Sequence, residues 1–225
     1  MKTEKEGCEH FLAKYLLYPA FGIIKSLRIR KILMSLILKL EKGELYTITL
    51  RKIFNNYFHL DIGMYSEGGC FVLFNFTHTP PATKIGRYCS FANSIKVFNA
   101  NHPMNLLSTH AFFFNPWFGL VKEDILARTQ LTIGNDVWIG HNAVIMPSVS
   151  RIGDGAVIGA NSVVSQDVPD FAVVSGFPAR ILRYRFDPDT IKKIKESSWW
   201  DKSIRELSKN IKEFQKPFDG SDTIV

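Results

Sequence analysis

A six-residue repeat of apolar and small side chains runs through residues 131–168. An Ile-Gly pair opens four of the units, at positions 133, 139, 152 and 158, and the residue four places after each start is again apolar or small. Neither the 3.6-residue period of a helix nor the alternation of a strand produces this spacing. A period of six is typical of a parallel β-helix, in which each short strand turns a corner and stacks on the coil below.

The same repeat is present, less regularly, in the preceding part of the chain. Ile62 and Ile85, each followed by Gly, open earlier units, and the period continues to Val97. Between these units, residues 70–76 form an apolar run that predicts a further strand. We therefore expect the coil to begin near residue 61 and to be interrupted once.

That interruption is an insertion at residues 103–130, which carry no six-residue period. Loops of this length without a period of their own are usually functional or disordered. The insertion is rich in aromatic residues, which argues against disorder. These residues are Phe112, Phe113, Phe114, Trp117 and Phe118.

Helices are predicted on both sides of the repeat. Residues 9–42 have helical character with a break near Pro19, because Pro lacks the backbone donor and disfavours helix in the residue before it. After the repeat, Pro188 suits the first turn of a helix and Asp187 suits its N-cap. A last helix is expected over residues 203–215, whereas residues 46–60 are interpreted as a short connection to the coil.

The positive charge of the chain is concentrated near its N-terminus. The formal net charge is +7, and residues 1–60 hold 11 of the 28 Lys and Arg residues but only 5 of the 21 Asp and Glu residues. Such a basic arm suits acidic lipid or an anionic polymer; no nucleic-acid-binding motif accompanies it, so we expect no nucleic-acid partner. Charges interrupt residues 23–40 too often for a membrane span. We favour packing of this helix within the protein, with peripheral contact to an anionic membrane as the alternative.

The cysteines indicate a reducing environment. Cys8, Cys70 and Cys89 are odd in number and far apart, which is not the pattern of a disulfide framework or a paired metal motif. No secretory signal pattern is seen, so a cytoplasmic location is expected. Cys89 occupies a small corner position of the repeat and is expected to face inward with its thiol protonated, which disfavours covalent catalysis.

His102 is the leading candidate for catalysis. It stands where the chain leaves the coil for the insertion, and therefore at the edge of a cleft. Imidazole titrates near neutral pH and can accept a proton from a hydroxyl or an amine. His110, inside the insertion, is the rival, and His141 is expected to point outward from the coil. A zinc site on these three residues is an alternative, but their spacing lacks a close His pair, and we expect no metal.

Several motifs carry a family resemblance. Asp136-Val-Trp-Ile-Gly140, Ile-Gly-Asp-Gly-Ala-Val-Ile-Gly-Ala at 152–160 and Gly176-Phe-Pro-Ala-Arg180 resemble the hexapeptide-repeat acyltransferases. Residues 186–191 with Trp199-Trp200-Asp201 are similar to the xenobiotic acetyltransferase branch and its polysaccharide O-acetyltransferase relatives. The resemblance implies a left-handed parallel β-helix, a homotrimer and acetyl-CoA as co-substrate.

The resemblance also implies roles for individual residues. His102 matches the general base of a direct transfer in a ternary complex. The residues that match the coenzyme site are Trp138, Gly140, His141, Ala160, Ser165, Arg180 and Arg183. Guanidinium groups suit phosphate, but Gln166 stands where the family commonly has Lys. The acceptor is expected to meet Asn75, His110, Phe112, Phe113 and Trp117.

Together these patterns predict a mainly β protein in three parts. A helical extension covers residues 1–60, a left-handed β-helix covers 61–186 with the inserted loop at 103–130, and C-terminal helices with a tail cover 187–225. The expected function is transfer of an acetyl group from acetyl-CoA to a sugar hydroxyl of a surface polysaccharide or its precursor, in the cytoplasm or at the inner face of the membrane.

Two alternatives stay open. A xenobiotic such as chloramphenicol or a streptogramin is the second candidate acceptor, and a non-catalytic assembly scaffold is the alternative of another class. The residues by themselves leave undecided the identity of the acceptor, O- versus N-acylation, the length of the acyl chain and the group that orients His102.

Overall fold

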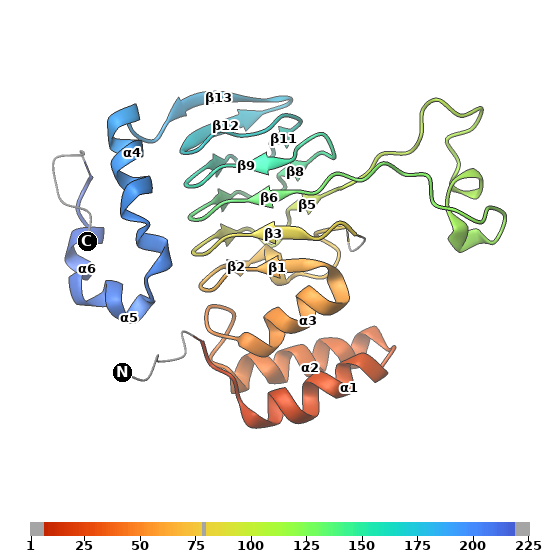
Figure 1. Cartoon of the computed structure of the whole chain (residues 1–225), viewed down its shortest axis with the longest axis horizontal. Coiled ribbons are helices and arrows are strands. Elements are labelled where there is room, and N and C mark those ends of the chain that lie inside the picture. The colour runs from red at the N-terminus through yellow and green to blue at the C-terminus, as the bar shows by residue number, and fades with distance from the viewer. Residues whose placement is uncertain (1–6, 78–79, 219–225) are drawn as a thin grey trace.

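The computed structural model describes residues 7–77 and 80–218, which form a three-sided coil of parallel strands with helices at its base and along one side (Figure 1). The chain passes from one sheet to the next and returns one coil further on, so the sheets have the orders β1-β3-β6-β9, β2-β4-β7-β10-β12-β13 and β5-β8-β11. The strands are β1 (Leu60–Ile62), β2 (Glu67–Gly68), β3 (Thr83–Ile85), β4 (Ser90–Phe91), β5 (Lys96–Val97), β6 (Thr132–Ile133), β7 (Trp138–Ile139), β8 (Val144–Ile145), β9 (Arg151–Ile152), β10 (Val157–Ile158), β11 (Val163–Val164), β12 (Ala172–Gly176) and β13 (Ala179–Tyr184).

The six-residue period places one apolar side chain from each strand on the axis of the coil. Ile85 pairs with Ile133, and Ile133 pairs with Ile152, in parallel register. Equivalent ladders run up the other two sheets, where Ile139 pairs with Ile158 and Val97 with Ile145. All of these side chains are buried. Burial of stacked Ile and Val side chains, at about 1.5–3 kcal/mol each, is what stabilises strands of only two residues. The predicted repeat is confirmed.

One corner of the coil has a left-handed backbone in every turn. The residues in the left-handed region at this corner are Tyr65, Tyr88, Asp136, Gly155 and Phe171. This conformation costs an L-residue roughly 1–2 kcal/mol, so the tight corner is retained because the coils stack closely above and below it. A Cβ atom at Gly155 would lie 2.5 Å from the Phe171 ring, which explains why the fourth corner is glycine.

The apolar run at residues 70–76 is not a strand, and that prediction was wrong. It forms a 3-10 turn (Gly69–Phe71) followed by irregular backbone and one isolated bridge from Phe76 to Val97. The run is apolar because a helix covers it from below: the Phe71 ring packs edge-on against Phe54 at 5.4 Å. Burial therefore accounts for Cys70, Phe71 and Phe76, whereas Phe74 is 60% exposed and strand pairing is limited to the one bridge.

The N-terminal helices differ from the prediction in two places. A π-helical turn (Ala13–Leu17) runs into α1 (Tyr18–Ile23), α2 covers Leu27–Leu40, and α3 covers Ile48–Phe58. Pro19 does not break the helix, because the π turn places it in the first turn of α1, where its missing N–H is tolerated. The break comes at Ile24 instead.

Helix α3 was missed, and it closes the open base of the coil. The Thr47 hydroxyl caps its N-terminus by accepting from the Leu50 N–H. Its buried Arg51 donates to the carbonyls of Gly63 and Ser66 in the first coil. Those carbonyls face the end of the stack, so α3 supplies the donors that a further coil would otherwise provide. Figure 1 shows α3 lying between the coil and the pair α1–α2.

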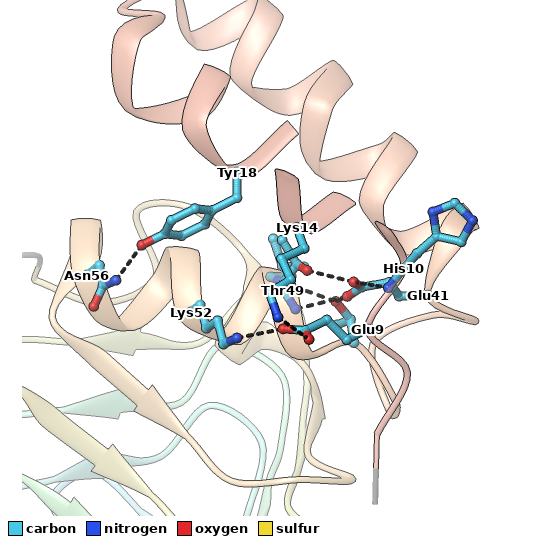
Figure 2. A network of polar contacts seen from close by, with 10 residues as sticks. Glu9, His10, Lys14, Tyr18, Glu41, Thr49, Lys52 and Asn56 are labelled. Atoms are coloured by element: carbon cyan, nitrogen blue, oxygen red, sulfur yellow. Dashed lines mark hydrogen bonds and ion pairs between the residues drawn. The ribbon is translucent and has the colours of Figure 1, made fainter. Parts of the chain in front are cut away.

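A polar network ties the start of the described chain to these helices (Figure 2). The fully buried Glu41 carboxylate accepts from the His10 N–H at 3.0 Å, the Thr47 hydroxyl at 2.6 Å, and both the N–H and the hydroxyl of Thr49. Glu9 beside it accepts from Lys14 and Lys52, and these hydrogen bonds lower the pKa of the Glu9 carboxyl to about 2. The base of the coil is thus rigidly assembled.

At the other end of the coil, β12 and β13 form an antiparallel hairpin, and α4 (Pro188–Ser197) follows. Asp187 caps α4 by accepting from the Thr190 N–H, as predicted. The predicted helix 203–215 is divided into α5 (Ile204–Leu207), a 3-10 turn (Ser208–Asn210) and α6 (Ile211–Phe214). Ser208 and Asn210 have low helix propensity, and α6 buries no side chain that would compensate.

The three-part division of the chain stays a prediction. Its outermost segments, residues 1–6 and 219–225, lie outside the described residues.

Candidate active site

His102 lies just beyond the neck of the insertion. The two ends of the insertion are held together there, because the Thr129 N–H donates to the Asn99 carbonyl at 2.8 Å. From this neck the insertion extends well away from the coil (Figure 1). The His102 side chain is exposed, and its ring meets the buried Phe114 edge-on at 4.9 Å. Phe114 and the neck thus limit the positions that the ring can take.

One hydrogen bond determines the tautomer of His102. Its Nδ1 lies 2.9 Å from the Thr109 carbonyl oxygen. A carbonyl oxygen only accepts, so Nδ1 carries the hydrogen and donates it. In the neutral ring the lone pair is therefore on Nε2, which is the state that a general base requires.

His110 has the opposite arrangement. It caps the 3-10 turn Ala111–Phe113, and its Nδ1 accepts from the Phe112 N–H at 3.3 Å. An accepting Nδ1 leaves the hydrogen of the neutral ring on Nε2. The two His residues of this region are therefore chemically distinct, and the outward nitrogen of His110 is a donor.

The aromatic residues of the insertion are largely exposed. Trp117 is 87% exposed and Phe113 is 56% exposed, whereas Phe112 stacks edge-on against Phe118 at 5.1 Å. They are displayed by two short 3-10 turns, Ala111–Phe113 and Pro116–Phe118, each capped by a side chain. The insertion is thus a structured arm with an uncovered aromatic surface.

Four of the five predicted coenzyme residues within the repeat lie on or just after β7 and β10, two neighbouring strands of one sheet, whereas Ser165 follows β11 of another sheet. Trp138 on β7 is flanked in register by Ser90 and Val157, and its side chain is 57% exposed. A Cβ atom at Gly140 would lie 2.7 Å from the Ala160 nitrogen, so glycine is required for the close stacking of these coils. His141 and Ala160 are exposed at the following corner, and Ser165 is half-buried.

The two predicted phosphate ligands lie on the terminal hairpin. Arg180 and Arg183 are exposed on β13, where their guanidinium groups donate to the carbonyls of Ala179 and Tyr184. Arg185 is different, because it pairs with Asp136 at 2.8 Å and also donates to a coil carbonyl. Arg185 is therefore committed to the coil, while Arg180 and Arg183 present charge to solvent.

Asn75 is placed away from solvent. It is 3% exposed, and its amide nitrogen donates to the carbonyls of Gly69 and Asn93. This geometry favours a structural role, in which the amide joins successive corners of the coil. Its role in acceptor binding stays a prediction.

Sequence reasoning missed the groups that orient the His residues. Ser94 lies 3.0 Å from Nδ1 of His141 and also accepts from the Asn142 N–H, which holds that corner together. Thr109 orients His102 through its backbone, and a backbone carbonyl carries no signal in the residue type. The available signal in the sequence is that His102 and Thr109 are only 7 residues apart at the start of the insertion, which allows a local contact.

Neither the zinc alternative nor the cysteine alternative finds support. Across residues 7–77 and 80–218, no group of three His, Cys, Asp or Glu side chains could hold a metal ion. Burial raises the pKa of the Cys89 thiol to about 12, so it is protonated at neutral pH, as expected for an inward-facing side chain. The buried thiol of Cys89 disfavours covalent catalysis, whereas the His102 side chain is exposed.

The repeat and its relatives identify the family. Residues 131–166 match the bacterial transferase hexapeptide family, described as six repeats. A probable macrolide acetyltransferase of Lysinibacillus sphaericus is 37% identical over 133 residues, which cover 56% of this chain and 73% of that protein. The chain belongs to the hexapeptide-repeat transferases. The predicted resemblance is therefore confirmed.

Other hexapeptide-repeat transferases match over shorter parts. A chloramphenicol acetyltransferase of Agrobacterium fabrum (strain C58 / ATCC 33970) is 42% identical over 122 residues, or 52% of this chain and 58% of the relative. The galactoside O-acetyltransferase of Escherichia coli (strain K12) is 51% identical over 70 residues, or 31% of this chain and 34% of the relative. The chain thus spans less than two thirds of the length of these two proteins.

The family match divides the candidate site. Trp138, Gly140, His141, Ala160 and Ser165 lie inside the matched hexapeptide repeats of residues 131–166. The insertion with its leading His lies before them, and the hairpin that carries the two exposed Arg residues lies after them. The assignment of a base in this hexapeptide-repeat transferase therefore rests on local geometry and not on the matched repeats.

Proposed function

We propose that this protein transfers an acetyl group from acetyl-CoA to a hydroxyl of a sugar in a surface polysaccharide or its precursor. The observation that carries the proposal is the Nδ1 contact of His102 with the Thr109 carbonyl at 2.9 Å, because it leaves Nε2 as a proton acceptor on an exposed side chain. Membership of the hexapeptide-repeat transferases supplies the class of reaction.

The chemistry proposed for His102 is direct transfer. Nε2 takes the hydroxyl proton while the hydroxyl oxygen forms a bond to the thioester carbonyl carbon. When the tetrahedral intermediate collapses, the carbon–sulfur bond breaks and the proton passes from Nε2 to the departing thiolate. The products are an acetyl ester and free coenzyme A, and His102 returns to its neutral state. The Thr109 carbonyl also stabilises the imidazolium that forms in between.

The coenzyme is proposed to lie along the exposed edge of the coil. Trp138 and Ala160 present exposed surface there, and glycine at position 140 allows the two coils that carry them to stack closely. Ser165 and His141 extend the same set. Arg180 and Arg183 are proposed to meet the phosphates, since their guanidinium groups face solvent. The left-handed sense of the coil belongs to this proposal.

The acceptor site is proposed to form on the insertion with the help of a second copy. Uncovered aromatic rings such as Trp117 and Phe113 are characteristic of binding surfaces and not of isolated monomers. Because the insertion extends away from its own coil (Figure 1), a neighbouring subunit of a homotrimer is the natural cover. Aromatic rings of this kind stack on sugar faces or on an apolar drug.

The second candidate is a xenobiotic acceptor. The chloramphenicol and macrolide acetyltransferases match over 122 and 133 residues, longer stretches than the 70 residues that match the galactoside enzyme. The basic N-terminal helices favour the polysaccharide acceptor, because an exposed basic surface suits an anionic polymer or the surface of an anionic membrane.

The test is release of free coenzyme A from acetyl-CoA by the full chain, against hexoses, oligosaccharides, chloramphenicol and a streptogramin. Release that depends on a saccharide supports the proposal. Release that depends only on a drug contradicts the saccharide acceptor and favours the second candidate, a xenobiotic acceptor. Binding of coenzyme A is measured by calorimetry on the same sample, with Arg180→Ala/Arg183→Ala as the weakened variant. A protein that neither binds coenzyme A nor releases it contradicts the proposal and favours the assembly scaffold.

A further inference from the structure

The pair α1–α2 has one face that nothing in the chain covers. Both helices pack on α3, α2 also packs on the π-helical turn before α1, and Figure 1 shows the pair at the base of the coil with α3 above it. The side turned away from α3 nevertheless carries large apolar residues. Those exposed on this pair and the helical turn before it are Phe11, Leu12, Tyr15, Leu16, Ile23, Leu27, Ile29, Ile32 and Leu36.

The exposed side of α2 consists of two parallel stripes. Ile29, Ile32 and Leu36 follow the i, i+3, i+7 spacing of one helical face. Arg28 and Lys31 begin the adjacent stripe, which Lys39 completes. Among the described residues none of these three basic side chains forms an ion pair.

The charge of this surface is of one sign. Residues 10–40 contain no Asp or Glu, so nothing within the helices neutralises the exposed basic side chains. Arg30 is the one basic residue of α2 that is half-buried, because it donates to the Ile24 carbonyl and lies over the Phe21 ring. The other basic residues of α2 remain in solvent.

We propose that this outer face of α1 and α2 docks on the surface of an anionic lipid bilayer. Such a surface satisfies both stripes together: phosphate headgroups neutralise the basic side chains, and the boundary of the acyl chains receives Ile32 and Leu36. A nucleic acid would leave the apolar stripe in water. A second copy of the same face would oppose like charges, which is unfavourable. An anionic membrane is the occupant that the charge and the apolar pattern fit together.

The contact is peripheral and leaves the transferase site free. No helix within residues 7–77 and 80–218 is long and apolar enough to cross a bilayer. The helices lie across the base of the coil, whereas the insertion leaves the coil higher up (Figure 1). A chain docked through α1 and α2 therefore presents His102 and the insertion to substrates near the membrane surface.

The experiment is co-sedimentation of the full chain with phosphatidylcholine vesicles with and without phosphatidylglycerol. The test variant is Arg28→Glu/Lys31→Glu/Lys39→Glu. Its matched control, Lys192→Glu/Lys209→Glu/Lys212→Glu, changes the net charge equally on exposed positions of the C-terminal helices. Each basic residue at an anionic surface contributes roughly fivefold to partitioning. We expect the test variant to lose at least about 100-fold and the control to stay near the wild-type value.

A second variant separates lipid from protein contact. Ile32→Gln/Leu36→Gln keeps the helix and the charge, and we expect it to lower partitioning by about tenfold without changing the molar mass in light scattering. Circular dichroism checks that both variants are folded. The proposal fails if the wild type stays in the supernatant with anionic vesicles, if test and control variants lose partitioning equally, or if the Gln variant changes the oligomeric state instead.

Discussion

Replacing His102 by Asn separates the two roles of its ring. The amide nitrogen of Asn lies close to the place of Nδ1 and can still donate to the Thr109 carbonyl, which preserves this local contact. Nothing in Asn takes the place of Nε2. The variant therefore retains the local fold and removes the proton acceptor.

The magnitudes distinguish catalysis from support. A general base contributes about 10²- to 10⁴-fold to the rate, or about 2.7–5.4 kcal/mol of transition-state stabilisation. A single neutral hydrogen bond such as the one to Thr109 contributes about 1 kcal/mol, which is less than tenfold. We expect His102→Asn to lower kcat/KM by at least about 100-fold while the KM for acetyl-CoA changes little.

The assay is initial-rate release of coenzyme A with the acceptor that responds in the panel. His110→Asn is the comparison variant, because its side-chain oxygen can accept from the Phe112 N–H as the ring now does. His110 is itself a predicted acceptor contact, so we expect its substitution to change the KM for the acceptor and to leave kcat within roughly threefold of the wild-type value. Retention of more than a tenth of wild-type kcat/KM by His102→Asn would refute the assignment.

Four further outcomes test the fold and the site. Glu41→Gln should lower the free energy of unfolding in urea by about 3 kcal/mol, because the amide NH2 that replaces one carboxylate oxygen cannot accept from the N–H and O–H groups around it. A loss below about 1 kcal/mol contradicts this. Gly140→Ala should cost about 1–3 kcal/mol in the same assay, since its Cβ would lie 2.7 Å from backbone of the next coil, and an unchanged midpoint would show that the coils separate easily. Hydrogen bonds from Lys52 and Lys14 lower the pKa of the Glu9 carboxyl to about 2, so they stabilise the fold at pH values above the ordinary pKa of a Glu carboxyl. This stabilisation is lost as the pH falls towards 2. The Tm of Glu9→Gln should therefore decline less than that of the wild type over this pH range. Iodoacetamide at about pH 8 should modify Cys8 but spare native Cys89, and mass spectrometry that finds Cys89 alkylated before unfolding would contradict its burial.

The repeat and the caps are features that local sequence determines. Positions 133 and 152 stack because each coil repeats the same pattern, so a single period read along the chain specifies the ladder between coils. Asp187 caps α4 through a contact only three residues away. In both cases the partner lies at a fixed, short spacing or at an identical place in the next unit.

The base of the coil was decided by tertiary packing. Residues 46–60 gave no strong helical signal, yet α3 forms there because the open coil needs apolar cover and the donors of Arg51. The run at 70–76 reads as a strand by composition, but it forms a 3-10 turn in which Phe71 packs on Phe54 of α3. Propensity is a weak term beside the burial of an exposed coil end.

The candidate site shows the same division. The type of residue at 102 and its place before an insertion were enough to nominate a base, because imidazole chemistry belongs to the side chain. Its tautomer depends on the Thr109 carbonyl, and the burial of Asn75 depends on two other carbonyls. Every residue has a carbonyl, so residue identity cannot mark which one is used. The repeat specified the scaffold through periodicity, whereas the orientation of the reacting groups arose from single contacts that the fold alone brings together.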